Sequence, residues 1–448
     1  MKFSLFGTKS RSSGGQERGE AGEVDVASSG AGSAGRRSFS VLLVSQLLAT
    51  TAFMFVVPFM PLYVQQLGVE DAGSAALWAG IINGASGATM ALVAPLWGRL
   101  SDRMGRKIML LRATLTAVVV VGSMAFVTAP WQLLILRLLQ GTLTGTVPAA
   151  TALVASTAPP DKAGGRLGTL QTVIFIAAGV GPALGGISAD AAGIETSFFL
   201  ASGLLAISGA LVLFGVAQDR PQRASDEEGE VEEETVPASL PYRRLMPGLL
   251  TLFAVHVAIT SAAVALPGFL HALSGDASGI ATQAGWIIGT GALVASLGSL
   301  FGGKLAGRIG ARRMIALSLG LAGLAAIPQA LVPGVPELWA LRLTTSLFLG
   351  SAIPVANLLI KDASPPERQG AAFGFASSAT AMGFALGPMG GGLIASSLGF
   401  RAAFLIPGAA LLGLAIVLGA VWAMRSSSGG SVKKRPAFWK AILTHLAR

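Results

Sequence analysis

Few residues in this sequence could carry out chemistry of their own. The chain of 448 residues contains no cysteine, which excludes thiol nucleophiles, disulfides and thiolate metal sites. It has no HExxH motif and no phosphate-binding P-loop, so neither a zinc hydrolase nor an ATPase is indicated. We therefore predict that the protein is not an enzyme and that it uses no metal ion and no organic cofactor.

Three ionisable side chains are candidates for ion pairing and proton transfer: Asp102, Arg137 and His256. Arg137 and His256 lie inside apolar stretches, where a charge is costly and needs a partner or a water-filled cavity. Arg137 could instead extend its stem to the membrane surface, and His256 could be a neutral hydrogen-bonded histidine. No Asp or Glu lies deep inside an apolar stretch, so Asp102 and His256 are the possible proton carriers.

The elements that must position these residues are membrane helices. The chain is 52% hydrophobic and 12% charged, whereas a soluble domain has about 25% charged residues. A helix needs about 20 mostly apolar residues to cross a bilayer. Twelve stretches qualify: 39–64, 74–98, 107–128, 131–157, 166–189, 196–217, 244–271, 279–302, 312–331, 336–360, 370–396 and 400–424. We predict an all-α integral membrane protein with twelve transmembrane helices.

The polar segments divide the chain into five regions. We expect a disordered tail over 1–38, a six-helix bundle over 39–217, an acidic linker over 218–243, a second six-helix bundle over 244–424 and a basic tail over 425–448. The net charge of +10 comes mostly from loops on one side of the membrane, and Arg401 is the one clear base on the other side. This bias predicts that both termini are cytoplasmic, and it explains the charge better than nucleic-acid binding does.

One loop pattern occurs twice. Residues 98–107 read GRLSDRMGRK and residues 303–312 read GKLAGRIGAR, at an offset of 303 − 98 = 205 in the numbering. Arg137 in LRL and Arg342 in LRL have the same offset, 342 − 137 = 205. The chain therefore reads as two homologous bundles. Duplicated bundles of this kind are usually transporters with the ligand site between the halves.

The first loop resembles the signature between the second and third helices of the major facilitator superfamily. The resemblance extends to the multidrug exporters of its twelve-helix drug/proton antiporter branch, and it implies two pseudo-symmetric six-helix bundles. It also implies a conformational latch at the cytoplasmic ends of the helices, with Asp102 paired across the bundle. The latch residues are Gly98, Asp102, Arg103, Gly105 and Arg106. The second copy has Gly307 in place of Asp102, so only the first half could form this latch through that carboxylate.

A second resemblance lies in the fifth predicted span, where Gly181, Pro182, Gly185 and Gly186 match the antiporter motif of exporters in this superfamily. A Gly-Pro pair bends a membrane helix, and flanking glycines let a neighbouring helix approach. The alternative is generic close packing at a kink. Arg137 similarly resembles the arginine of the fourth helix that is linked to proton transfer in drug/proton antiporters, so it is a candidate for coupling beside Asp102 and His256.

The resemblance also implies a substrate cavity between the halves, lined by spans 1, 4, 7 and 10. Polar or aromatic residues inside spans are its candidate lining groups: Gln46, Thr50, Asn83, Gln140, Gln171, His256, Trp286 and Asn357. Helix–helix hydrogen bonding and lipid contact are equally open for each of them. As a set they describe a mostly apolar cavity with a few hydrogen-bonding groups, which suits amphiphilic molecules.

Together these features predict a multi-pass transporter of the plasma (inner) membrane that exports lipophilic small molecules. Proton antiport is expected from the resemblance, and efflux without a proton stays open. The alternative is uptake or exchange of a defined polar metabolite on the same fold. We expect a monomer whose partners are the substrate and the lipid bilayer.

Overall fold

A computed structural model describes residues 20–159, 162–218, 242–275, 278–365 and 368–427 of the chain. The side chains of 20–36, 95, 98, 99, 102, 163, 164, 370 and 425–427 are not described. Twelve helical segments in this part of the chain are long and apolar enough to cross a membrane, which confirms the predicted number of spans.

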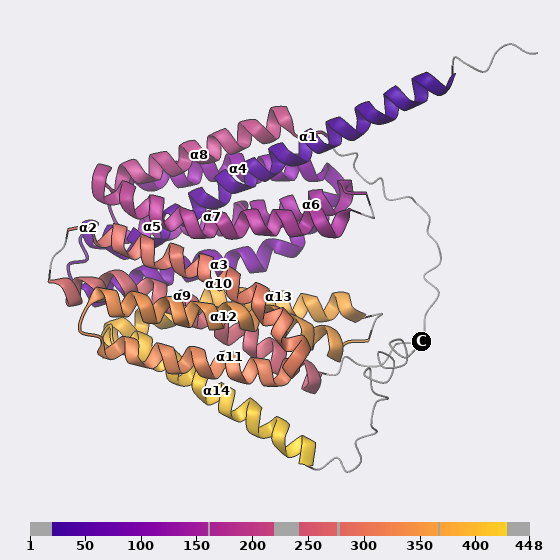
Figure 1. Ribbon diagram of the computed structural model, residues 1–448. Helices are drawn as coiled ribbons and strands as arrows, with labels where there is room; N and C mark the ends of the chain where they lie inside the picture. The colour runs from indigo at the N-terminus through magenta and orange to yellow at the C-terminus, as the bar shows by residue number, and fades with distance from the viewer. Residues whose placement is uncertain (1–19, 160–161, 219–241, 276–277, 366–367, 428–448) are drawn as a thin grey trace, which may run out of the picture.

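The first half of the chain builds six of these segments. They consist of α1 (Glu20–Phe55), η1 (Val57–Phe59) and α2 (Met60–Gln66) in span 1, α3 (Ala72–Met104), α4 (Arg106–Ser123) with η2 (Met124–Phe126), α5 (Pro130–Leu143) with α6 (Thr146–Thr157), α7 (Ala163–Ala192) and α8 (Ile194–Gly215). Helix α1 begins inside the segment 1–38 for which disorder was predicted, because extending a helix that its apolar part has nucleated costs far less than starting a new one. Figure 1 shows its first turns extending beyond the bundle.

The second half repeats this order with fewer breaks. Its segments are α9 (Tyr242–Ser274), α10 (Ile280–Ile309), α11 (Ala311–Ala326) with η3 (Ile327–Leu331), α12 (Val335–Ala363), α13 (Gln369–Leu398) and α14 (Ala402–Ser427). Helix α14 enters the predicted tail 425–448, and the remainder of that tail lies outside the described residues. So does most of the predicted linker 218–243.

The duplication is visible in the turns. Gly105 separates α3 from α4 at a φ of 95°, and Gly310 separates α10 from α11 at a φ of 91°. Both donate their N–H groups to a carbonyl four residues earlier. Such positive φ values are accessible to glycine at low cost, so the repeated glycine fixes where both helices end. We call the end of the bundle that carries Gly105 and Gly310 the basic end, and the other the opposite end.

Span 4 departs from the prediction of one helix over 131–157. Thr144 is extended and Gly145 has a φ of 134°, so the span is divided into α5 and α6. The counterpart of Gly145 in the second half is Gly350 (350 − 145 = 205), which lies inside the continuous helix α12. The duplicated halves therefore differ in one of the spans that carries a buried arginine.

The two halves meet along two seams at the opposite end. In the first seam α3 packs on α13, and a Cβ atom at Gly80 would collide with the carbonyl of Pro388. In the second seam α7 packs on α10, and a Cβ atom at Gly285 would collide with the carbonyl of Pro182. Backbones approach this closely only where side chains are absent, which explains the glycine content of these helices.

The seams end before the basic end. Gly168 of α7 lies about five turns from Gly186 of the seam and on the same helix face, yet no atom lies within 4 Å of the position of its Cβ. The same holds for Gly303 of α10 with respect to Gly285, and for Gly374 of α13 with respect to Gly392. Figure 1 shows α8 and α14 diverging towards this end. The halves are thus closed at the opposite end and separated at the basic end.

Candidate functional site

The most informative polar side chains are four buried groups on spans 1 and 4. Gln46 and Thr50 of α1 are 0% and 5% exposed, and Arg137 and Gln140 of α5 are 8% and 7% exposed. Both amide atoms of Gln46, the hydroxyl of Thr50, Nε and Nη2 of Arg137 and Oε1 of Gln140 have no hydrogen-bond partner among the described residues. Unpaired buried polar atoms are costly, so these atoms require water or a ligand.

Helix geometry places these groups at the depth of the membrane centre. Gln140 lies ten residues below Pro130, where α5 begins, which corresponds to about 15 Å along the helix. Thr51 packs against Gly181 of α7 in the same half, and a Cβ at Gly181 would lie 2.8 Å from the carbonyl oxygen of Thr51. Gly181 lies about 16 Å from Ala192, where α7 ends at the opposite end. The hydrocarbon core is about 30 Å thick, so both sites are near its middle.

Packing against α3 holds α5 in this position. The Cβ of Gly141 would collide with the backbone of Ser86, and the Thr89 hydroxyl lies 3.4 Å from the carbonyl oxygen of Leu138. Trp97 donates from Nε1 to the carbonyl of Thr142 at 2.6 Å. The buried face of α5, which carries Leu133, Arg137 and Gln140, is thereby directed into the first half.

His256 occupies the corresponding interior of the second half. Its Nδ1 lies 2.7 Å from the carbonyl oxygen of Leu252, which accepts but cannot donate, so Nδ1 carries the proton. In the neutral ring Nε2 therefore has a free lone pair. The ring centroid lies 4.8 Å from that of Phe384, and Gly383 lets α13 approach the Cβ of His256. The geometry fits a group that can accept a proton.

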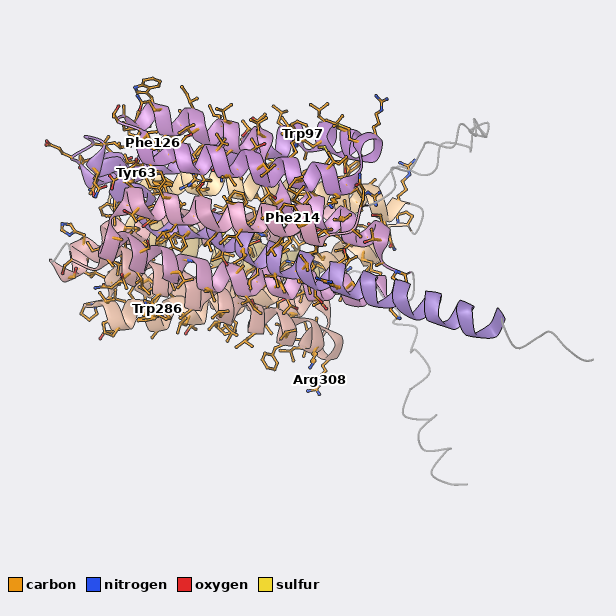
Figure 2. The ribbon with its side chains drawn as sticks, turned by 90° about the horizontal axis from the view of Figure 1, so that it is seen from above. Tyr63, Trp97, Phe126, Phe214, Trp286 and Arg308 are labelled. Carbon is orange, nitrogen blue, oxygen red and sulfur yellow. The ribbon has the colours of Figure 1, made fainter. Side chains whose placement is uncertain are left out.

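None of the remaining cavity candidates is fully buried. Asn83 of α3 and Asn357 of α12 are half-buried, and Gln171 of α7 is exposed. Trp286 of α10 is 44% exposed, and Figure 2 shows it near the edge of the bundle. It shares a helix face with Leu293 and Leu297, which are also exposed. This face has the apolar character expected for contact with lipid.

The loop signature joins helices within the first half. Arg106 donates from Nη1 to the carbonyl of Ala152 in α6 at 3.1 Å, and Lys107 donates to the carbonyl of Leu213 in α8 at 3.0 Å. Arg103 is exposed in the last turn of α3, and Gly98 lies in the same helix. Asp102 also lies in that turn, but its side chain is outside the described part of the structure. The predicted pairing of Asp102 is therefore untested.

The glycines of the predicted antiporter motif lie at helix contacts on two sides of α7. Gly181 and Gly185 face α1, and a Cβ at Gly185 would collide with the backbone of Phe55. Gly186 faces α10 of the other half, at the backbone of Ala281 and Thr282. Pro182 lies inside the helix and contacts Gly285 through its carbonyl. The motif is thus part of the seam that closes the opposite end.

Sequence reasoning singled out Arg137 but not its counterpart as a site residue. Arg342 is also 8% exposed, and its Nη2 donates to the carbonyl of Ile259 at 3.3 Å. It lines a cavity of about 10 Å³, room for one water molecule, together with Gln329 and Thr345, which are hydrogen-bonded at 2.7 Å. The signal that could have identified Arg342 was its offset from Arg137, which equals the offset between the two loop copies.

Comparisons with known proteins agree with this architecture. The sequence model of the Major Facilitator Superfamily matches the chain over residues 42–281 and 248–447. The chain is 36% identical over 359 residues to a protein of Proteus mirabilis named multidrug resistance protein MdtG, covering 80% of this chain and 89% of that protein. It is 31% identical over 388 residues to a Lactococcus lactis protein named multi-drug resistance efflux pump PmrA homolog, covering 86% and 94%.

Solved structures resemble the fold at low sequence identity. A nucleoside transporter, NupG, superposes with a TM-score of 0.67 at 15% identity, covering 85% of this chain and all (100%) of that chain. A peptide transporter, POT, superposes with a TM-score of 0.68 at 14% identity, covering 87% and 94%. These similarities confirm the predicted fold class, and the sequence matches confirm the predicted family.

Proposed function

Because this chain belongs to the Major Facilitator Superfamily, we propose that it exports lipophilic or amphiphilic small molecules across the membrane by alternating access, driven by proton antiport. The observation that carries the export of such compounds is its identity of 31–36% to proteins named for multidrug resistance or multidrug efflux. Each of these alignments covers at least 80% of this chain.

The distribution of basic residues supports an orientation with the basic end in the cytoplasm. Arginine and lysine favour cytoplasmic loops, and the basic end carries Arg103, Arg106, Lys107, Arg308, Arg312 and Arg313. Both termini would then be cytoplasmic. The chain would form two bundles, near residues 39–217 and 244–424, joined by the segment 218–243. In this orientation the structure corresponds to an inward-open state, in which substrate enters from the cytoplasm.

The unpaired polar atoms of Gln46, Thr50 and Gln140 are the proposed hydrogen-bonding groups for the substrate. They are buried on spans 1 and 4, near the membrane centre. A few polar groups in an apolar site suit an amphiphilic molecule, since a polar metabolite such as a sugar would require many fixed partners. No observation favours the alternative of a polar metabolite.

For proton coupling we propose that Nε2 of His256 accepts the proton and that the buried side chains of Arg137 and Arg342 are the charges that respond to it. His256 lies near the middle of α9, and Arg342 binds the carbonyl of Ile259 one turn away on the same helix. Protonation of His256 would add a second positive charge at this level of the bundle. A cationic substrate and a proton would then disfavour each other's binding, which is the requirement for exchange.

For the latch we propose that Asp102 engages the second half when the basic end closes. Asp102→Asn removes the charge and keeps the shape, so it should slow transport several-fold with unchanged membrane insertion. The measurement is dye flux per inserted protein in vesicles. Normal turnover of Asp102→Asn would remove the latch from the mechanism.

The experiment that tests the proposed function uses purified protein in sealed liposomes that contain a lipophilic fluorescent dye. A pH gradient is imposed in one direction and then in the other, with protein-free liposomes as the control. Proton antiport predicts protein-dependent dye flux that changes direction with the gradient. Protein-dependent flux that ignores the gradient would contradict coupling, and absence of flux across a dye panel would contradict export.

A further inference from the structure

We propose that Asp190 locks the opposite end of the transporter by capping helix α10 across the boundary between the two halves. Asp190 belongs to the last turn of α7 in the first half, and its carboxylate Oδ2 accepts a hydrogen bond from the backbone N–H of Thr282 at 2.7 Å. Thr282 is the third residue of α10, in the second half. This inference rests on the alternating access of the proposed function.

Helix α10 needs this external partner because its own cap is missing. The N–H groups in the first turn of a helix have no partner inside the helix, and they carry the positive end of its dipole. The N-cap residue of α10 is Gly279, which has no side chain to accept a hydrogen bond. The carboxylate of Asp190 accepts at the third position, where an N-cap side chain normally acts.

The related seam between α3 and α13 is built differently. The counterpart of Asp190 is Ser396 (396 − 190 = 206), whose hydroxyl bonds back to Leu393 of its own helix. There α3 has its own N-cap residue, Asp71, which accepts from the N–H of Ser74 at 2.7 Å. This hydrogen bond lowers the pKa of Asp71. At the seam of α3 and α13 the helix cap, Asp71, belongs to the same half as the helix it caps. At the seam of α7 and α10 the cap, Asp190, belongs to the other half.

The antiporter motif sets the distance that allows this contact. Gly186 precedes Asp190 by one turn on the same helix face, and its Cβ would lie 2.7 Å from the carbonyl carbon of Ala281 and 2.9 Å from Cα of Thr282. Without a side chain at Gly186, α7 approaches the first turn of α10 closely enough for the short Asp190 side chain to reach the N–H of Thr282. The motif glycine and the carboxylate thus act together.

The cap must break in each transport cycle, since the opposite end has to open. Asp190 is exposed, and it lines a pocket of about 380 Å³ that also includes Gln65 and Gln66 of α2 and Ala281 of α10. Water in this pocket can solvate the carboxylate once the halves separate. The cap then stabilises only the state that is closed at this end. Asp190 is a positioning residue that holds the opposite end closed, and it needs no contact with the substrate.

The test measures the fraction of molecules that are open at the opposite end. The chain has no native cysteine, so Thr196→Cys in α8 and Ser397→Cys in α13 can carry spin labels on exposed positions of the two halves without background. Distance distributions are recorded by electron paramagnetic resonance in lipid nanodiscs. Asp190→Ala should raise the ratio of open to closed molecules about five-fold, the equivalent of the ~1 kcal/mol that a side-chain cap contributes.

Two further variants separate a lock from a general loss of helix stability. Asp71→Ala removes a cap of the same length within one half, and it should leave the open fraction unchanged. Asp190→Asn should keep this end closed, because asparagine caps a helix about as well as aspartate. The proposal is overturned if Asp190→Ala gives the distribution of Asp71→Ala, or if Asp190→Asn opens this end as alanine does. A labelled parent protein that never opens, even with dye present, would instead contradict alternating access itself.

Discussion

The buried polar side chains of this protein divide into those with partners and those without. Thr345, Gln329 and Arg342 form hydrogen bonds inside the second half. Gln46 and Thr50 have unpaired atoms in the first half. Since a buried polar atom without a partner costs about 1–3 kcal/mol, the unpaired group marks where water or substrate must bind. Among the described residues most of the unpaired buried atoms belong to the first half, and the second half contributes Ser261 Oγ, Gln283 Oε1 and Gln329 Oε1.

His256 offers a direct test of proton coupling. Replacing it with glutamine preserves much of the polarity and removes the ring nitrogen that can accept a proton, so the pH dependence of dye exchange should flatten. The matched control is His271→Gln, since His271 lies on the same helix but is exposed in its last turn. The pH profile is measured in proteoliposomes. A profile unchanged by His256→Gln would make this histidine purely structural.

Arg137 is expected to link the proton to the substrate. Arg137→Ala should lower gradient-driven exchange about ten-fold, a barrier change of about 1.4 kcal/mol, while downhill dye flux without a gradient persists. Both rates are measured on the same liposomes. Equal pH dependence in the variant and the parent protein would show that Arg137 takes no part in coupling.

Among single residues, the sequence identified which polar groups are buried, but it did not identify the residues that they contact. Gln46, Thr50, Arg137, Gln140 and His256 stood out as polar residues inside apolar stretches, and all are buried. Asp190 did not stand out, because an acidic residue at the end of a span reads as a boundary. Its hydrogen bond to Thr282 joins residues 92 positions apart, and no local pattern encodes such a contact.

At the level of helices, close backbone contact depends on specific glycines. A Cβ at Gly185 would lie 2.6 Å from the carbonyl carbon of Phe55 and 2.7 Å from its Cα, and both are backbone atoms that cannot move aside. Gly185→Ala should therefore force α7 away from α1 and lower the stability by about 1–3 kcal/mol. The measurement is thermal unfolding of the purified protein in detergent.

The control for this substitution lies on the next helix. Gly203 of α8 has no atom within 4 Å of its Cβ position, so Gly203→Ala should be neutral or slightly stabilising, because alanine favours the helix. Equal unfolding temperatures for Gly185→Ala and Gly203→Ala would disprove the close contact of α7 with α1.

The existence of helices followed from the sequence more reliably than their continuity did. The length and composition of the apolar stretches predicted twelve spans, and twelve are found in the described part of the chain. The break at Gly145 was missed, because the apolar stretch 131–157 is long enough for one continuous membrane helix. Whether a glycine continues a helix depends on its neighbours: Gly350 packs on the backbone of Ala295, whereas Gly145 has no atom within 4 Å of its Cβ position.

For the whole molecule, the duplication predicted two halves, but it did not predict at which end of the bundle the halves are in contact. The offset of 205 to 206 residues between the two halves places equivalent glycines on equivalent helices, and these glycines form both seams at the opposite end. Which end is closed depends on the balance of contacts at the two ends, such as the cap at Asp190. A conformational equilibrium of this kind is not encoded in periodicity or composition.

The central claim is that the two halves open alternately at the two ends of the bundle. The most direct measurement uses two spin-label pairs in the otherwise unchanged chain: Thr196→Cys with Ser397→Cys at the opposite end, and Thr169→Cys with Lys304→Cys on exposed positions at the basic end. Distances are recorded with and without dye and across a pH change. We predict that the first distance lengthens as the second shortens. Distances that stay constant, or that lengthen together, would contradict the account.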